Sequence, residues 1–498
     1  MKYEFVQPRF SEGVLAKSLQ GRSGEEFYKY GMKGAKNMIP ILSGPVVKRP
    51  GTNFIGTLKD ASAIFIPFFK DKDNTYIIEL GSTSPSSGGY LRLWSQDQLL
   101  NDKQGTPAIY EVTSGVTWTQ AQLLTLKYTQ SGDYIFVCCP TKAPQIIKRE
   151  IITGGSSSGF AADDSVWTVF EYVMIDGPYK SINVYSEDAA STDKYALYIA
   201  EPTNKEEIAG VEFNTLTNNI VLPNHGLQTG MKIRLDDDGS TKAWGNITSD
   251  GTAVLVDADY YVINTTSTSF QISVDDGGSP LEFELKSGTD TASADVKVFR
   301  YVYPSSASGI TFTLYKNGVV SNDLFDSGND VNRMIRINPL AKPLSRIGGV
   351  RWCWGIITAV GTNTIDVALK TEMANIRGGL PSGSNKKAGT PDFRLGAFSV
   401  GEGFPSVSQI YQQRMVLAAT TVQPSTVWLS KTANFYSFAP TDIPAQDSPS
   451  SIVAGEATEV ITSSSGLTFT LDSDTLDEIK WLAESKKLTM GTSAGVYM

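Results

Sequence analysis

The sequence predicts a mainly β protein: an interrupted β-propeller-like body with inserted small β-barrel or β-sandwich domains and a short N-terminal helix. Three observations predict this fold. A strand–turn–strand hairpin recurs four times, the interval between its second and third copies follows another pattern, and 45 Gly and 21 Tyr in 498 residues suit strands joined by many turns. One hairpin cannot bury its own apolar face, so like neighbours must pack against it.

Residues 1–42 are predicted to form an N-terminal arm with a helix over Gly24–Met38. Ser23, followed three residues later by Glu26, matches the capping box of a helix N-terminus, and Pro40 ends the helix. Two internal glycines weaken such a helix by about 1 kcal/mol each. We therefore expect this helix to depend on packing against another surface.

The next segment, residues 43–175, is predicted to begin the propeller-like body. It opens with an exposed basic pair, Lys48-Arg49, and with Pro50-Gly51, a dipeptide typical of tight turns. Two hairpins follow in this segment, and two more are expected in residues 396–498, which continue the body. The paired runs are Tyr76–Leu80 with Tyr90–Ser95, Tyr134–Cys139 with Gln145–Lys148, Met415–Ala419 with Val427–Ser430, and Leu488–Thr492 with Val496–Tyr497. Any all-β protein contains similar hairpins, so a propeller is one interpretation of the repeat.

Residues 176–395 are predicted to be inserted β-domains, with a small β-barrel module at about 211–274. Alternating apolar residues at Asn219–Leu222 and Met231–Leu235 flank His225, the only histidine of the chain. We expect His225 at a turn or strand end, hydrogen-bonded locally or solvated, where its replacement by Asn or Gln changes little. The His-Gly-Leu-x-Thr-Gly step resembles a module inserted in many phage structural proteins and also found in ubiquitin-activating enzymes.

The sequence offers little for catalysis or metal binding, and we expect no catalytic residue, cofactor or metal ion. Gly491–Gly495 fits the G-x-S-x-G pattern around Ser493, but a hydrolase of that kind needs a histidine after the serine, and His225 precedes it. Three cysteines, two of them adjacent in an apolar strand, suit small buried hydrophobes rather than a zinc site or a disulfide framework.

Composition limits the partners. The net charge of -9 disfavours a surface that grips nucleic acid, although it is compatible with DNA sliding past. No apolar run approaches the roughly 20 residues of a membrane span, and the N-terminus lacks a signal-peptide core. We therefore expect a soluble protein without stable membrane insertion, made in a cytoplasm.

Three stretches resemble the tail nozzle proteins of short-tailed bacteriophages, also called tubular tail protein B. The first holds QPRFSEGVL, GRSGEEFYKYGMKGAKNMIP and VKRPGTNFI, the second is Leu124–Arg149, and the third is Gly401–Phe438. They follow in the family's order and cover about half of the chain. The residues that match the family's motifs, for which we predict a role in assembly or packing, are Lys48, Arg49, Pro50, Gly51, Thr52, Phe404, Pro405, Tyr411, Gln413, Arg414 and Trp428.

The resemblance implies a virion structural protein in the phage tail. It implies a homo-oligomeric ring, a hexamer, that extends the channel of the portal-adaptor protein and conducts genome DNA during ejection, with transient DNA contact in the lumen. Tail fibres or spikes are further partners of such a ring. The alternative is a carbohydrate-binding or glycan-degrading β-propeller tail protein. Exposed tryptophans and converging carboxylates in a cleft would favour this alternative, whereas broad subunit contacts would favour the nozzle.

Overall fold

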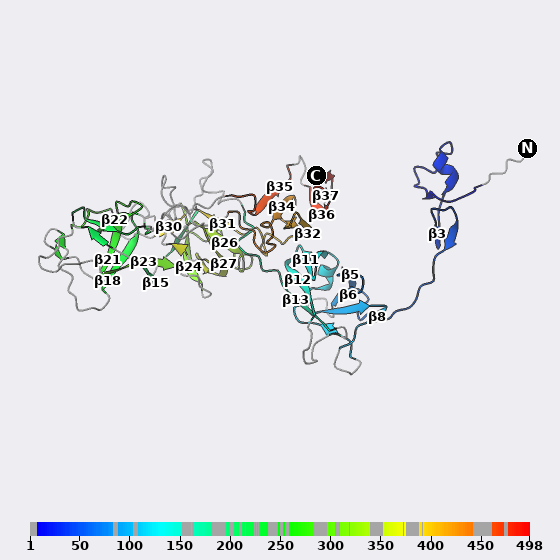
Figure 1. The fold of residues 1–498 in the computed structure, drawn as a ribbon, viewed down its shortest axis with the longest axis horizontal. Coiled ribbons are helices and arrows are strands. Elements are labelled where there is room, and N and C mark those ends of the chain that lie inside the picture. The colour runs from blue at the N-terminus through cyan, green and yellow to red at the C-terminus, as the bar shows by residue number, and fades with distance from the viewer. Residues whose placement is uncertain are drawn as a thin grey trace, which may run out of the picture. The chain divides into compact units, whose positions relative to one another are not determined.

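A computed structural model gives the fold (Figure 1). It describes residues 7–82, 88–102, 108–151, 161, 164–180, 195–199, 204–208, 212–214, 216–223, 225, 227, 229–237, 248–249, 252–253, 258–275, 277–282, 296–303, 309–317, 319–338, 352–371, 373–374, 388–390, 392–441, 461–472 and 477–498. Strands make up 49% and helices 3% of these residues, which confirms the mainly β prediction. The chain divides into two compact units, residues 1–59 with 96–99 and residues 60–95 with 100–498.

The first unit contains only short elements. These are β1 (Gly13–Val14), the 3-10 helix η1 (Glu26–Tyr30), β2 (Gly31–Met32), β3 (Met38–Pro40), β4 (Val46–Lys48) and β8 (Gln98–Leu99). Strands β1 and β2 pair in parallel, and β3 and β4 form an antiparallel hairpin that places Ile39 opposite Val47. The predicted domain boundary at residue 42 stays a prediction, while the compact unit reaches Lys59.

The predicted helix over Gly24–Met38 is wrong in length and kind. The residue that caps η1 is Glu25, which makes no side-chain capping bond, and the chain becomes extended at Gly31. A Cβ on Gly31 would lie 2.4 Å from the side chain of Leu15, and the Leu15 N–H donates to the Met32 carbonyl at 2.9 Å. Gly31 weakens a helix, but its missing side chain lets the chain approach Leu15 closely. Hydrogen bonds to the β1 segment therefore form in place of helical ones.

In the second unit, four sheets form the propeller-like body (Figure 1). Sheet 1 has β5 (Ile64–Phe69), β6 (Thr75–Ser82) and β7 (Gly89–Ser95), with β9 (Glu111–Val112) beside β7, and sheet 2 has β10 (Lys127–Ser131), β11 (Tyr134–Cys139), β12 (Lys142–Ile151) and β13 (Ser165–Glu171). Sheet 3 has β32 (Val407–Tyr411), β33 (Arg414–Ala418), β34 (Thr426–Leu429) and β35 (Leu467–Thr470), and sheet 4 has β36 (Ile479–Glu484), β37 (Leu488–Thr492) and β38 (Val496–Tyr497). All four predicted hairpins are confirmed as antiparallel pairs.

The four sheets pack face to face in order, although the insertion separates the second from the third in sequence. Residues Ile135 and Val137 of β11 join the core shared with sheet 1, whereas Phe136 and Cys138 join the core shared with sheet 3. Strand β33 alternates in the same way between the cores shared with sheets 2 and 4. Because both faces of these strands are buried, their sequences are hydrophobic without alternation.

The first strands of the four sheets meet, as the innermost strands of propeller blades do. Gln130 of β10 holds the backbone of Phe69 in β5, accepting from its N–H at 3.1 Å and donating to its carbonyl at 2.6 Å. The Thr129 hydroxyl donates to the Ser408 carbonyl of β32 at 2.6 Å, and the Lys127 ammonium donates to the Lys480 carbonyl of β36. Side chains of β10 thus tie together all four sheets.

Two further curved sheets lie between β13 and β32 in sequence, and the structure holds one nearly closed barrel-like sheet and one half-barrel. One comprises β14 (Tyr195–Ile199), β24 (Ile310–Lys316), β25 (Val319–Val320), β26 (Met334–Ile337), β27 (Cys353–Val360), β28 (Thr364–Leu369), β30 (Ala388–Thr390) and β31 (Phe393–Leu395). The other comprises β15 (Asn204–Ile208), β16 (Glu212–Asn214), β17 (Asn219–Val221), β18 (Lys232–Asp237), β21 (Ala258–Ile263), β22 (Ser269–Ser273), β23 (Val296–Tyr303) and β29 (Met373–Ala374). The last elements are α1 (Gln120–Leu123) and the hairpin β19 (Thr248–Ser249) with β20 (Thr252–Ala253).

The small module predicted at about 211–274 is part of the second of these sheets, which also draws strands from residues 204–208, 296–303 and 373–374. The insertion leaves and re-enters the body through adjacent segments. Lys180 N–H donates to the Leu395 carbonyl and Ala397 N–H donates to the Pro178 carbonyl, each at 2.9 Å. A long insertion can therefore be accommodated without separating sheets 2 and 3.

Candidate functional site

The motif residues of the third stretch lie in or beside sheet 3, at its contact with sheet 2. Trp428 is fully buried there, with its ring edge-on to Phe398 at 4.9 Å between centroids. Pro405 is buried, and Phe404 packs against the same core while its N–H donates to the Pro140 carbonyl at 3.0 Å. These motif residues therefore connect two sheets that are far apart in sequence.

Three other motif residues form the β32–β33 hairpin. Tyr411 pairs with Arg414 at its end, and Gln413 has a positive φ of 60° in the turn. Arg414 is buried and donates through Nη1 to the carbonyls of Ser430 and Ser465, at 2.6 and 2.7 Å, and through Nη2 to the carbonyl of Ser463. Its guanidinium fork thus joins β33 to the end of β34 and to the segment before β35.

The motif residues of the first stretch belong to the other compact unit. Lys48 ends β4, and Arg49 donates through its backbone N–H to the Asn37 carbonyl at 3.0 Å and through Nε to Asn37 Oδ1 at 3.3 Å. Pro50, Gly51 and Thr52 are exposed and form no turn, so the predicted tight turn is wrong; the turn of this hairpin lies at residues 42–44 instead. The role of the motif residues in assembly stays a prediction.

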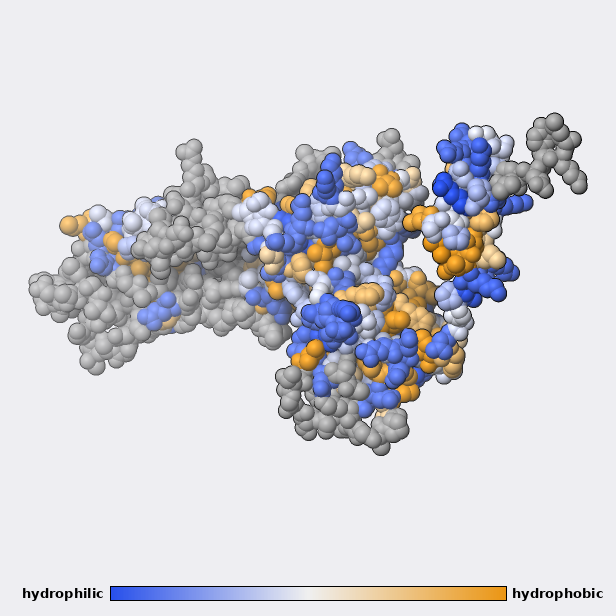
Figure 2. Space-filling model, turned by 45° about the vertical axis from the view of Figure 1, so that its right-hand side comes forward, coloured by the Kyte–Doolittle hydropathy of each residue, from blue (hydrophilic) through white to orange (hydrophobic). Residues whose placement is uncertain are grey.

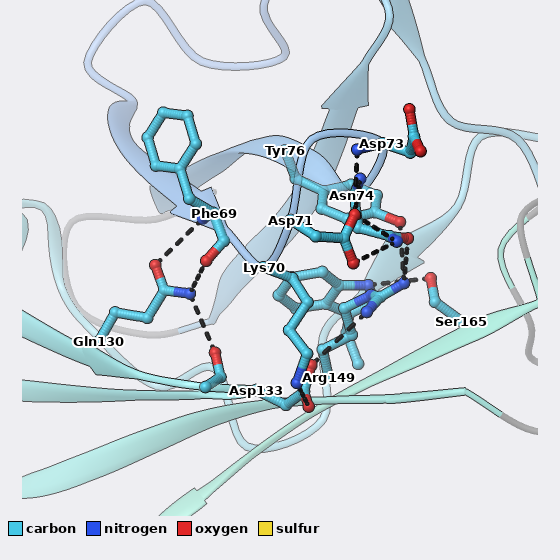
Figure 3. Close-up of polar contacts among 12 residues, drawn as sticks. Phe69, Lys70, Asp71, Asp73, Asn74, Tyr76, Gln130, Asp133, Arg149 and Ser165 are labelled. Carbon is cyan, nitrogen blue, oxygen red and sulfur yellow. Dashed lines mark hydrogen bonds and ion pairs between the residues drawn. The ribbon is translucent and has the colours of Figure 1, made fainter.

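A buried arginine at the contact of sheets 1 and 2 was not singled out by the sequence (Figure 3). The Arg149 side chain is 3% exposed, and its Nη2 donates to Asn74 Oδ1 at 2.7 Å and to the Tyr76 hydroxyl at 3.2 Å. Its Nη1 lies 3.5 Å from Asp133 Oδ1. Asp71 accepts from the N–H and the amide of Asn74, and these bonds, the side-chain bond first, lower the pKa of Asp71. The cluster locks the β5–β6 turn onto sheet 2.

A second buried cluster lies where the insertion joins the body. Glu402 Oε1 accepts from Lys180 Nζ at 2.6 Å and from Arg333 Nη2 at 3.0 Å, while Arg333 Nη1 lies 2.6 Å from Asp330 Oδ1. Arg333 Nε also donates to the Gly396 carbonyl at 2.9 Å. Breaking one partner of such a buried network is costly, so it fixes the insertion on sheet 3. The sequence did not predict this cluster, because its charged residues are far apart along the chain.

His225 is buried, and its ring is hydrogen-bonded locally, which is one of the two arrangements expected for it. The Leu227 N–H donates to Nδ1 at 3.0 Å, so Nε2 carries the proton and donates to the Thr266 carbonyl at 2.9 Å. The ring also packs on Phe270, 5.1 Å between centroids. Burial lowers the pKa of His225 below its ordinary value of 6.5. The ring thus links two segments of the module that are 41 residues apart in sequence.

Replacing His225 with glutamine should therefore destabilise the module by about 1–3 kcal/mol, because the Leu227 N–H or the Thr266 carbonyl loses its hydrogen-bond partner. The lowered pKa means that the unfolded chain binds the proton first, so wild-type stability is present above pH 6.5 and falls as the pH drops below it. Urea unfolding of both proteins at pH 7.5 and pH 5 checks this: the difference in unfolding free energy should shrink at pH 5. A constant difference would contradict it.

The G-x-S-x-G segment is a hairpin turn, as the sequence predicts. It joins β37 to β38, with the Thr492 N–H donating to the Gly495 carbonyl at 2.8 Å. A nucleophile elbow would lead from a strand into a helix, but a strand follows here. All three cysteines are buried, and burial raises the pKa of Cys138 and of Cys353 to about 12. Within the described ranges, no three His, Cys, Asp or Glu side chains gather as a metal site would require.

The arm, which we define as residues 1–59, has an exposed apolar surface. No hydrophobic side chain among its described residues 7–59 is buried. Leu42 is 91% and Phe54 77% exposed, and Met38, Ile39, Val47 and Ile55 are exposed as well. In Figure 2, hydrophobic residues gather in the middle of this unit, at the right of the view, with hydrophilic residues above and below them. No helix in the described part of the chain has the length and hydropathy of a membrane-spanning segment.

Comparison with known proteins adds no family assignment: no protein-family model matches the chain, and no curated protein matches it.

Proposed function

We propose that this chain is the subunit of a tail nozzle of a short-tailed bacteriophage. Identical copies form a closed ring, a hexamer by the resemblance, that extends the portal-adaptor channel and conducts the genome DNA during ejection. The protein acts by shape and contact and not by catalysis. The three stretches that resemble the nozzle family are the sequence basis of the proposal.

The observation that carries the proposal is the arm without a core. A segment of 59 residues that buries no hydrophobic side chain in its described part cannot offset the entropy of ordering its backbone, about 1–2 kcal/mol per residue. An isolated two-stranded hairpin such as β3–β4 is marginally stable at best. Such a segment becomes ordered when its apolar side chains are buried in an assembly, which is the condition of a ring subunit.

The tryptophans favour the nozzle over the glycan-binding alternative. Glycan-binding clefts present exposed aromatic rings, whereas Trp118, Trp167 and Trp428 are 1%, 2% and 0% exposed. Of the tryptophans in the described residues, only Trp481 is exposed. The three buried tryptophans thus serve the contacts between sheets.

The charge suits a conduit. A net charge of -9 gives no excess of cations with which to hold phosphates, so passing DNA is not retained. Acidic side chains that line the channel would repel the DNA phosphates over about 10 Å at 0.1 M salt, which keeps the DNA away from the wall.

Native mass spectrometry of the purified full-length chain, alone and with the portal-adaptor protein of its phage, tests the proposal. We expect one closed oligomer of fixed subunit number, and a complex in which that ring joins the adaptor. The control is the same chain incubated with oligosaccharides of the host surface. A persistent monomer that binds or shortens these oligosaccharides would contradict the nozzle and support the alternative.

A further inference from the structure

The arm differs from the rest of the chain in charge as well as in burial. Residues 1–59 contain 10 Lys and Arg and 4 Glu, a net charge of +6. The whole chain has 43 basic and 52 acidic residues, so residues 60–498 hold 33 basic and 48 acidic residues, a net charge of -15. We call residues 60–498 the body. Arm and body are therefore electrostatically complementary, while two arms repel each other.

The basic residues lie beside the apolar surface. Lys48 is opposite Met38 in the β3–β4 hairpin, and Lys33 and Lys36, both exposed, come just before β3. An apolar patch with lysines around it matches the usual plan of an interface, with a hydrophobic centre and a polar rim. Its partner should carry apolar side chains bordered by acidic residues.

The arm also has reach. Residues 49–58, which follow β4, lie outside helices and strands. Ten extended residues span up to about 33–36 Å, which is comparable to the diameter of a small domain. In a closed ring each subunit has a neighbour within such a distance.

We propose that the arm binds the acidic body of a second copy of this chain, so that each subunit of the ring holds its neighbour. The apolar surface around Leu42 and Phe54 becomes buried there, and Lys33, Lys36 and Lys48 pair with acidic residues of that neighbour. This inference rests on the proposed function, because only a ring provides the neighbour. It deepens that function by naming the two surfaces in contact. Nucleic acid, a second arm and the chain's own body are the competing occupants.

Photo-crosslinking of the full-length protein distinguishes these occupants. A benzophenone amino acid replaces Leu42, and chains grown in ¹⁴N and ¹⁵N media are mixed in equal amounts, unfolded together, refolded and irradiated. Crosslinks within one chain carry one isotope, whereas half of those between chains carry both. We expect arm–body peptides of mixed isotope, in the same yield after nuclease treatment.

The double variant Lys33→Glu/Lys36→Glu should lower the mixed-isotope yield about fivefold, because it turns attraction into repulsion. The matched control, Lys33→Arg/Lys36→Arg, should keep it. Arm–body crosslinks that carry only a single isotope, a predominance of arm–arm peptides, or crosslinks to nucleic acid would overturn the inference. If a closed ring forms without mixed arm–body peptides, arm binding alone is wrong; if the chain stays monomeric in native mass spectrometry, the proposed function fails as well.

Discussion

Replacing Trp428 with alanine should destabilise the body by about 3–5 kcal/mol, among the largest effects of any single change. The indole is fully buried against Phe398 in the core that joins sheets 2 and 3. These sheets are separated by more than 200 residues of sequence, and their attachment depends on that core. We expect the two sheets to lose stability together.

Hydrogen–deuterium exchange in increasing urea checks this result. In Trp428→Ala, peptides from β11 and β33 should exchange at lower urea concentrations than in the wild type. Their opening free energies should fall by the same amount. Trp481→Ala is the matched control: that side chain is 45% exposed, so the loss should be about 1 kcal/mol. Equal losses in both variants, or a loss confined to β33, would contradict the account of a shared core.

Replacing Arg414 with methionine should cost about 3 kcal/mol, because it removes charge-assisted hydrogen bonds and leaves carbonyls without them. The carbonyls belong to Ser430, Ser463 and Ser465, and two of these residues, Ser430 and Ser465, are fully buried. The segment 461–466 should then exchange its amide protons faster, as measured by mass spectrometry.

Arg414→Lys provides the comparison that isolates geometry. Lysine keeps the charge but cannot match a fork that reaches three carbonyls, so it should restore only part of the lost stability. Lys487→Met, at an exposed position, is the control for loss of a positive charge. Full recovery with lysine would show that charge alone is what this site needs.

The strands could be predicted because their burial pattern is local. IFVCC of β11 and MVLA of β33 are hydrophobic throughout, and each supplies both faces of an interior sheet. The hairpins followed from turn residues between such runs, and the mainly β fold followed from the hairpins. The sequence also singled out Arg414 and Trp428, through the resemblance to the nozzle family.

What failed depended on contacts between distant residues. The Ser23/Glu26 pattern predicted a helix, but the contact of Gly31 with Leu15 favours a strand. The burial of His225 could not be predicted, because Phe270 and Thr266, which cover and bind it, are more than 40 residues away. Arg149 gave no signal, since its partners Asn74 and Tyr76 lie in the β5–β6 turn and on β6 of another sheet.

Cryo-electron microscopy of the virion of a short-tailed phage that carries this chain tests the central claim most directly. The account predicts a ring of identical copies directly below the portal-adaptor protein, coaxial with the DNA channel, with the arm of each copy ordered on the body of its neighbour. Copies placed around the side of the tail as separate spikes, away from the channel axis, would contradict it.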